Sequence, residues 1–145
     1  MDHQLSGITV ETTVNKPVEN VWKIWTTPAD IRQWNNPFDD WHSPRVENDL
    51  KQGGSFLYRM EAKDGSAGFD HCGKYDKVIN NQLIEYTVSD GRKSIIKFVP
   101  TGDTTIVIET FEPEKENPIE MQRDFCQSVL NNFKKYAENK NNSYD

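Results

Sequence analysis

The most reactive side chains of the sequence stand together at Asp70, His71 and Cys72. Such a trio could in principle hold a metal ion or pair a thiol nucleophile with its base. The alternation around it, however, predicts a strand over residues 69–79, and consecutive strand residues point to opposite faces. Asp70 and Cys72 could share a site that His71 cannot join. We therefore expect no metal site, no catalytic residue and no cofactor here.

Other candidate chemistry is equally sparse along the chain. The second cysteine, Cys126, lies far from Cys72 without paired spacing, so two reduced thiols in a cytoplasmic protein are expected. The acidic run over residues 112–116 is typical of a solvated connector. Gly53 and Gly54 open a predicted strand rather than a helix, which is not the arrangement of a phosphate-binding loop.

Charge and length exclude several classes of function. The 23 acidic and 17 basic residues leave a net charge of −6, and no basic run is present, so neither nucleic acid nor an anionic membrane is an expected partner. No apolar run reaches the ~18 residues of a membrane span. The 145 residues suit one domain, 1–145, with a core of about 8–138 and a flexible tail at 139–145.

The elements that would position any site are mostly strands. Alternating residues predict a first strand over residues 8–14, followed by two short helices bearing Trp22, Trp25 and Trp34. Residues 35–42 are expected to form an aromatic-bearing loop, packed inward or acting as a lid. Turn signals then divide residues 44–111 into a meander, in which Gly73 indicates a bulge or a close approach.

The longest helical pattern comes last, over residues 117–138. Asn117 is the expected N-cap, with Pro118 at the first helical position. Apolar residues at four-residue steps, including Phe125, Val129 and Phe133, form one broad face that needs a partner surface. We therefore predict a sheet that wraps around this helix.

This order of elements resembles the START-like (SRPBCC, helix-grip) superfamily. More narrowly, the chain is similar to a single-domain relative of the activator of the ninety-kilodalton heat-shock-protein ATPase, in its C-terminal domain. The resemblance is carried by Pro17-Val18-x-x-Val21-Trp22-x-x-Trp25-Thr26-x-Pro28, Ile31-x-x-Trp34, Asp49-Leu50-Lys51-x-Gly53-Gly54-x-Phe56, Gly73-x-Tyr75, and Phe111-Glu112-Pro113-Glu114 through Leu130-x-x-Phe133. Relatives often have Gly-Trp where this chain has Phe125-Cys126, which changes what the helix presents to the interior.

The resemblance implies an α+β helix-grip fold. Its curved antiparallel sheet of six to seven strands has two short helices after the first strand and a long C-terminal helix across it. A cavity between helix and sheet is implied as well. The side chains expected to line it are Trp25, Trp34, Phe38, Trp41, Phe56, Tyr58, Met60, Tyr86, Phe125, Val129 and Phe133. The alternative is that these aromatics only fill the core.

Three hypotheses from different classes follow. The favoured one is a binding module for an apolar or amphipathic small molecule, such as a lipid, sterol or polyketide, with a few polar groups placed in the cavity. Candidates for those groups are Tyr58, Tyr86, Arg59, His71 and Asp70. The second is a co-chaperone that binds a heat-shock chaperone and stimulates its ATPase. The third is a cyclase or hydrolase acting within the cavity, which the absence of a convergent triad disfavours.

Overall fold

The computed structural model describes residues 7–36 and 39–140. Within them the elements are β1 (Ile8–Val14), α1 (Val18–Thr26), α2 (Pro28–Trp34), β2 (Trp41–Asn48), β3 (Ser55–Ala62), β4 (Gly68–Ile79), β5 (Leu83–Val88), β6 (Lys93–Thr101), β7 (Thr104–Phe111) and α3 (Ile119–Asn139). None of the helices in the described part of the chain is long and apolar enough to cross a membrane.

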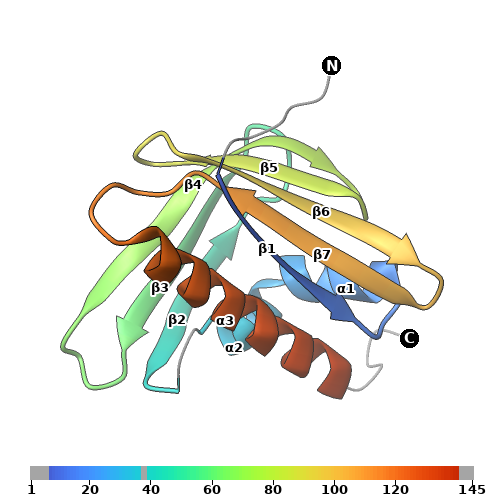
Figure 1. Cartoon of the computed structure of the whole chain (residues 1–145), viewed down its shortest axis with the longest axis horizontal. Coiled ribbons are helices and arrows are strands. Elements are labelled where there is room, and N and C mark those ends of the chain that lie inside the picture. Colours follow the sequence, from blue (N-terminus) through green and yellow to red (C-terminus); the bar gives the residue numbers. More distant parts are fainter. Residues whose placement is uncertain (1–6, 37–38, 141–145) are drawn as a thin grey trace.

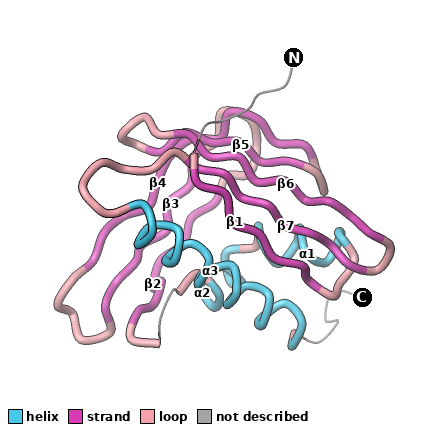
Figure 2. The backbone as a smooth tube through the Cα atoms, viewed as in Figure 1, coloured by secondary structure: helices cyan, strands magenta, loops and turns pink. Residues whose placement is uncertain are grey.

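The strands form one curled antiparallel sheet in the order β1-β7-β6-β5-β4-β3-β2. Successive strands from β2 to β7 are neighbours, as a meander requires, and β1 closes the order by pairing with β7. Figure 1 shows α3 running across the sheet, with α1 and α2 near one of its ends. The tube view in Figure 2 shows the strands curving around the same helix. The predicted α+β helix-grip fold is confirmed.

Alternation along the strands decides which side chains face the helices. In β1, Ile8, Val10 and Val14 are buried while Thr9 and Glu11 are exposed. A strand that is covered on one face only shows this period of two. The sequence pattern over residues 8–14 thus predicted both the strand and its inner face.

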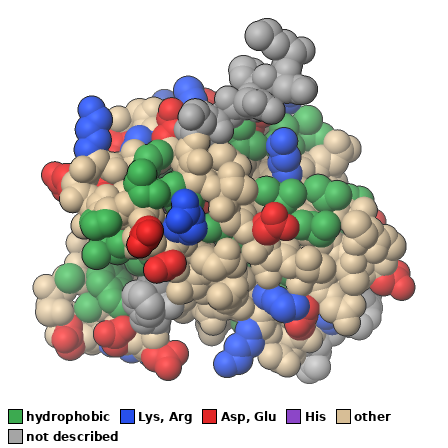
Figure 3. Space-filling model, in the orientation of Figure 1, with side chains coloured by type: hydrophobic (Ala, Val, Ile, Leu, Met, Phe, Trp, Pro, Cys, Tyr) green, Lys and Arg blue, Asp and Glu red, His purple; other side chains and the backbone are tan. Residues whose placement is uncertain are grey.

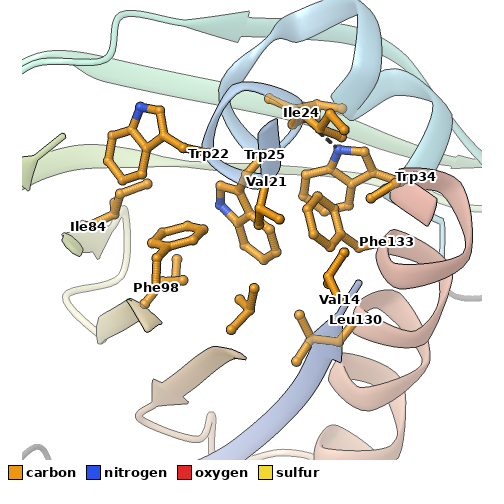
Figure 4. Close-up of a cluster of buried hydrophobic side chains, with 14 of the residues drawn as sticks. Val14, Val21, Trp22, Ile24, Trp25, Trp34, Ile84, Phe98, Leu130 and Phe133 are labelled. Carbon is orange, nitrogen blue, oxygen red and sulfur yellow. Dashed lines mark hydrogen bonds between the residues drawn. The ribbon is translucent and has the colours of Figure 1, made fainter. Parts of the chain in front are cut away.

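An aromatic core fills the space where α1, α2 and the second half of α3 meet (Figure 4). The ring centroid of Trp25 lies 4.7 Å from that of Trp34 and 4.9 Å from that of Phe133. The indole N–H of Trp34 donates a 3.1 Å hydrogen bond to the Ile24 carbonyl, so this buried polar group is satisfied. This part of the interior is closely packed.

The two halves of α3 are buried to very different extents. Leu130, Phe133 and Ala137, in its second half, are 0% exposed. In the first half Phe125 is only partly buried, and Met121 is 57% exposed. The second half of α3 is therefore packed tightly against the core, and the first half is packed loosely.

Two local predictions were wrong. Trp41 begins β2, opposite Ala62, rather than ending a loop, because pairing with β3 outweighs its weak local pattern. Helix α3 begins at Ile119, with Pro118 in the cap position and no side-chain cap from Asn117. At the start of α2, Thr27 stands in the cap position, but its hydroxyl donates a 2.6 Å hydrogen bond to the Lys23 carbonyl at the end of α1.

Candidate functional site

The inner face of β3, β4 and β5 carries a group of five rings in mutual contact, which we call the ring cluster. Phe56 lies at its centre. Its ring centroid is 4.8 Å from that of Tyr86 and 5.2 Å from that of Tyr75. The centroids of Tyr58 and His71 lie 5.4 Å and 5.5 Å away from it.

Strand register brings these rings together. Tyr58 of β3 is paired with His71 of β4, and Tyr75 of β4 with Tyr86 of β5. Directly opposite residues of an antiparallel pair point to the same face. Phe56 is paired with Gly73, which has no side chain to compete for the space.

Gly73 is required by a close approach of two strands. A Cβ atom at this position would lie 2.3 Å from the Thr87 carbonyl oxygen of β5. Real Cβ atoms do not come so near to backbone oxygen, so β4 and β5 could not pair here with a larger residue. The predicted close approach at Gly73 is confirmed, and the strand irregularity follows just beyond it, between Tyr75 and Lys77.

A small void of about 30 Å³ lies against the ring cluster. This is roughly the volume that one water molecule occupies in the liquid. Its lining consists of Trp25, Phe56, Tyr58, His71, Tyr75, Ile84, Tyr86 and Ile96. The residues that line the void come from α1 and from β3, β4, β5 and β6.

The phenols of the ring cluster are neutral hydrogen-bonding groups. Burial raises the pKa of Tyr75 to about 12 and raises the pKa values of Tyr58 and Tyr86 as well. Tyr58 and Tyr75 share a side-chain hydrogen bond, and the Tyr75 hydroxyl also donates to Oδ1 of Asn48. Three hydroxyl groups therefore stand among apolar ring faces, as in sites for amphipathic ligands.

His71 is neutral at physiological pH. Burial and, to a smaller extent, the positive charge of Arg92 lower its pKa from 6.5 to about 4, against a still smaller opposing effect of Asp90. Arg92 and Asp90 form an ion pair with a 2.8 Å contact from Nε to Oδ2. The imidazole thus adds polarity to the ring cluster without adding charge.

Glu109 is the inner-face residue that the sequence reasoning missed. It stands in β7 two residues from Val107 and two from Phe111, which are both buried on the inner face. It lies opposite Val10 of β1 and Ile96 of β6. The strand period of two could have found it, because Val107, Glu109 and Phe111 share one parity.

Burial raises the pKa of Glu109 to about 7. Its negative charge in turn contributes to the raised pKa values of Tyr58, Tyr86 and Cys126, so the carboxyl group lies near all three. No hydrogen bond or ion pair joins the Glu109 side chain to any other residue in the described ranges. A carboxyl group so placed changes charge near neutral pH.

The two cysteines lie on different surfaces. Burial raises the pKa of Cys126, so its thiol stays protonated and is a poor nucleophile. Cys72 shares the parity of Asp70 on β4, opposite to that of His71, and both thiols are free. Within residues 7–36 and 39–140, no group of three or more His, Cys, Asp or Glu side chains could hold a metal ion.

A second hollow of about 450 Å³ lies outside the ring cluster, between α2, the start of β2 and the second half of α3. Most of its lining is polar. The residues are Gln33, Asn36, Asp39, Trp41, Lys63, Ser128, Asn131, Asn132 and Lys135. The two hollows share no lining residue among those described.

Comparison with known proteins places the chain in a family. The family described as "Activator of Hsp90 ATPase homolog 1-like protein" matches residues 15–138. The chain belongs to this family. The AHSA1-like protein of Aeromonas hydrophila, solved by NMR, is 34% identical with a TM-score of 0.82, over 90% of this chain and 92% of that one. No curated protein matches the chain.

Two further solved structures support the assignment at different levels. Protein Chr148 of Cytophaga hutchinsonii is 53% identical with a TM-score of 0.80, over 92% of each chain. Protein CV1439 of Chromobacterium violaceum has a TM-score of 0.82 at 19% identity, over 92% of this chain and 98% of that one, and shows the fold alone. The resemblance drawn from the sequence is confirmed.

The structure of this AHSA1-like chain separates the predicted cavity residues into groups. Phe56, Tyr58 and Tyr86 belong to the ring cluster, and Trp25 lines the same void. Trp34 and Phe133 lie in the filled core instead.

The remaining predicted residues lie around these two groups. Met60 is buried, where its sulfur accepts hydrogen bonds from Asn35 and Ser43. Phe125 and Val129 are partly buried on α3, and Trp41 lines the outer hollow. Phe38 lies outside the described residues.

Two of the polar candidates face the other way. Nη1 of Arg59 lies 3.3 Å from Oδ1 of Asp70, and Nε of Arg59 lies 2.8 Å from Oε2 of Glu61. These residues alternate with Tyr58, Met60 and His71 along β3 and β4, so they belong to the outer face of the sheet. Of the polar candidates, Tyr58, Tyr86 and His71 come together, whereas Arg59 and Asp70 do not join them.

Proposed function

We propose that this AHSA1-like chain binds an amphipathic small molecule in a cleft that opens from the void towards the first half of α3, with the ring cluster as one wall. The observation that carries the proposal is the uneven packing of α3. Its second half is sealed into the core, while Phe125, Cys126 and Val129 in its first half are only partly buried. Opposite them stands an aromatic wall with three phenolic hydroxyls, which suits a ligand with both apolar and polar parts.

A ligand larger than a water molecule needs more room than the present void. The hydrogen bonds from α3 to β1 favour an opening at the N-terminal end of the helix. Gln127 donates to the Glu11 carbonyl at 3.1 Å and Lys134 to the Thr13 carbonyl at 2.8 Å, both beyond the first two turns. These contacts hold the middle and the second half of the helix in place.

The first turns of α3 are tied mainly to the segment just before them. Gln122 donates to the carbonyls of Glu114 and Asn117 at 3.1 Å and 2.8 Å and accepts a 2.9 Å hydrogen bond from the Glu114 N–H. The connector and the start of α3 can therefore move as a unit without breaking these bonds. Figure 3 shows hydrophobic side chains on the face of the molecule seen in Figure 1. Ile119 and Met121, at the start of α3, are both exposed.

The direct test is an amide NMR titration with a panel containing a medium-chain alcohol, a sterol and a flavone. We expect saturable shifts at the ring cluster and at residues 121–129, with small changes around Trp34 and Phe133. A panel that leaves all of these amides unchanged at millimolar concentration would overturn the proposal.

Two substitutions in α3 test whether the ligand binds against the inner side of this helix. Cys126→Trp puts a large ring into the cleft and should abolish binding. Asp124→Trp adds the same bulk on the exposed side of α3 and should leave binding intact. Equal affinities for the two variants would place the ligand elsewhere.

The family description supports a second candidate, contact with a heat-shock chaperone. Exposed Ile119 and Met121 at the start of α3 offer an apolar surface for such a contact. An ATPase assay of the cognate ninety-kilodalton chaperone with and without this protein tests it. Stimulation that Met121→Asp removes is the expected result, and an unchanged ATPase rate would reject it.

A further inference from the structure

We propose that the ligand of this cleft carries a primary ammonium group, which binds among the faces of the ring cluster with the Glu109 carboxylate as its counter-ion. This inference rests on the proposed function, since it names the chemistry of the ligand that the cleft takes. It depends on the position of Glu109, on the charges around it and on the aromatic lining of the void.

The position of Glu109 follows from strand register. Ile96 of β6 lines the void and lies directly opposite Glu109 of β7. Such partners point to the same face, with Cβ atoms about 5 Å apart. The charge of Glu109 is also felt by Tyr58 and Tyr86, two further residues of the lining. The Glu109 side chain therefore stands next to Ile96, at the edge of the residues that line the void.

The groups that surround Glu109 leave its charge uncompensated. Of its directly paired neighbours, Val10 on β1 and Ile96 on β6 are apolar. The polar groups on which its charge acts are two neutral phenols and a protonated thiol, those of Tyr58 on β3, Tyr86 on β5 and Cys126 on α3. The two other polar members of the ring cluster, His71 and Tyr75 on β4, are neutral as well.

Arg92, a cation that acts on the ring cluster, is already engaged in an ion pair. Arg92 acts on Cys126 and His71 from the turn between β5 and β6, but its guanidinium pairs with Asp90. A partly buried carboxylate without a partner among the described residues is unfavourable, and a ligand cation would reduce that penalty. The cleft therefore favours a cationic ligand over an anionic one.

The void fits an ammonium group in size and in lining. An ammonium group is close in size to a water molecule, and the void of about 30 Å³ holds roughly one water. Five of its lining residues, Trp25, Phe56, Tyr58, Tyr75 and Tyr86, present aromatic rings. Cations bind favourably over such faces, most strongly where water is excluded. The phenolic oxygens can accept hydrogen bonds from those N–H groups of the ammonium that do not donate to the carboxylate.

Ligand charge and Glu109 ionisation are then linked. The pKa of Glu109 is about 7, so the carboxyl group is mostly protonated at pH 6 and mostly ionised at pH 8. An ammonium ligand binds the ionised form. Its affinity should rise about tenfold between these pH values, because the ionised fraction rises about tenfold. A neutral ligand that accepts a hydrogen bond from the protonated carboxyl would show the opposite trend.

The experiment compares three probes of one shape: 2-phenylethylamine, 2-phenylethanol and phenylacetate. Dissociation constants are measured by NMR titration at pH 6 and pH 8 with the wild-type protein and with Glu109→Gln. At pH 8 we expect the amine to bind wild type at least tenfold more tightly than the alcohol, and phenylacetate to bind most weakly. In Glu109→Gln the advantage of the amine and its pH dependence should both disappear.

A second readout keeps the test independent of the variant's folding. In wild type labelled with 13C at the glutamate carboxyl groups, saturating amine should lower the pKa of Glu109 by about one unit or more. An unchanged titration of Glu109, or an amine that binds no better than the alcohol, would overturn the inference.

The outcomes distinguish this inference from the proposed function. If the alcohol binds and the amine shows no advantage, the cleft is still a ligand site and only the proposed preference for an ammonium group is rejected. If no probe, and no compound of the wider panel, perturbs the cleft, the proposed function fails as well.

Discussion

The Tyr136 hydroxyl, near the end of α3, lies 2.5 Å from Oδ1 of Asp30 in α2. Asp30 is 2% exposed, and Nζ of Lys140 lies 3.1 Å from the same oxygen. A buried carboxylate thus joins the last turns of α3 to the short helix beneath it. This contact anchors the half of α3 that is sealed into the core.

We expect Tyr136→Phe to lower the free energy of unfolding by about 1.5–3 kcal/mol, because it removes a hydrogen bond to a charged group in a buried site. Urea denaturation measures the change. Asp70→Asn is the matched control, since the ion pair of Asp70 with Arg59 is largely exposed and should contribute less than about 1 kcal/mol. A smaller loss in Tyr136→Phe than in the control would contradict the anchoring role.

The unequal halves of α3 predict unequal responses to truncation. Phe133→Ala removes a ring that is 0% exposed and should cost about 3–5 kcal/mol. Phe125→Ala, on the same helix, removes a partly exposed ring and should cost about 1–2 kcal/mol. Thermal and urea unfolding of the two variants give the comparison. Equal losses would mean that the first half of α3 is held as tightly as the second.

Glu109 should make the protein less stable as the pH rises towards neutrality. Its pKa is about 7 when folded against an ordinary 4.5, so between these values the folded state binds more protons than the unfolded state. The contribution to stability is present below about pH 4.5 and lost above about pH 7. We expect Glu109→Gln to be more stable than wild type by about 3 kcal/mol at pH 8 and equal to it near pH 4.

His71 should act in the opposite sense over a similar range. Its pKa is lowered from 6.5 to about 4, so below pH 6.5 the unfolded state binds more protons and stability falls as the pH falls towards 4. Unfolding curves of His71→Gln between pH 4 and 7 should lack this loss of about 3 kcal/mol. The wild-type profile is then flatter than that of either single variant. A wild-type profile steeper than both would show that these two groups do not govern it.

Much of the fold was readable because it follows from short-range patterns. The alternation of Ile8, Val10 and Val14 specified β1, and the four-residue steps of Phe125, Val129 and Phe133 specified the face of α3. Helix starts were less predictable. Asn117 has the residue type of a cap, yet its side chain does not cap α3, because Gln122 and Glu114 organise that turn.

The candidate site was only partly readable. Composition and resemblance pointed to Phe56, Tyr58 and Tyr86, but they pointed equally to Trp34, which lies in the filled core. The residue type alone does not distinguish an aromatic side chain that lines a cleft from one that is packed in the core. Glu109 was missed because nothing in the sequence marks it as an inner-face residue except its alternation with Val107 and Phe111 along the strand.

The sequence by itself therefore determined the elements, their order and the apolar face of each, because these depend on the chemistry of residues two to four positions apart. The tertiary structure decided which of those faces are sealed and which border a cleft. That outcome depends on how far the sheet curls around α3, and on Gly73 letting β4 and β5 approach beneath Phe56. The same curl buries Glu109 beside Tyr58 and Tyr86, residues 51 and 23 positions away in the chain, and so moves its pKa to about 7.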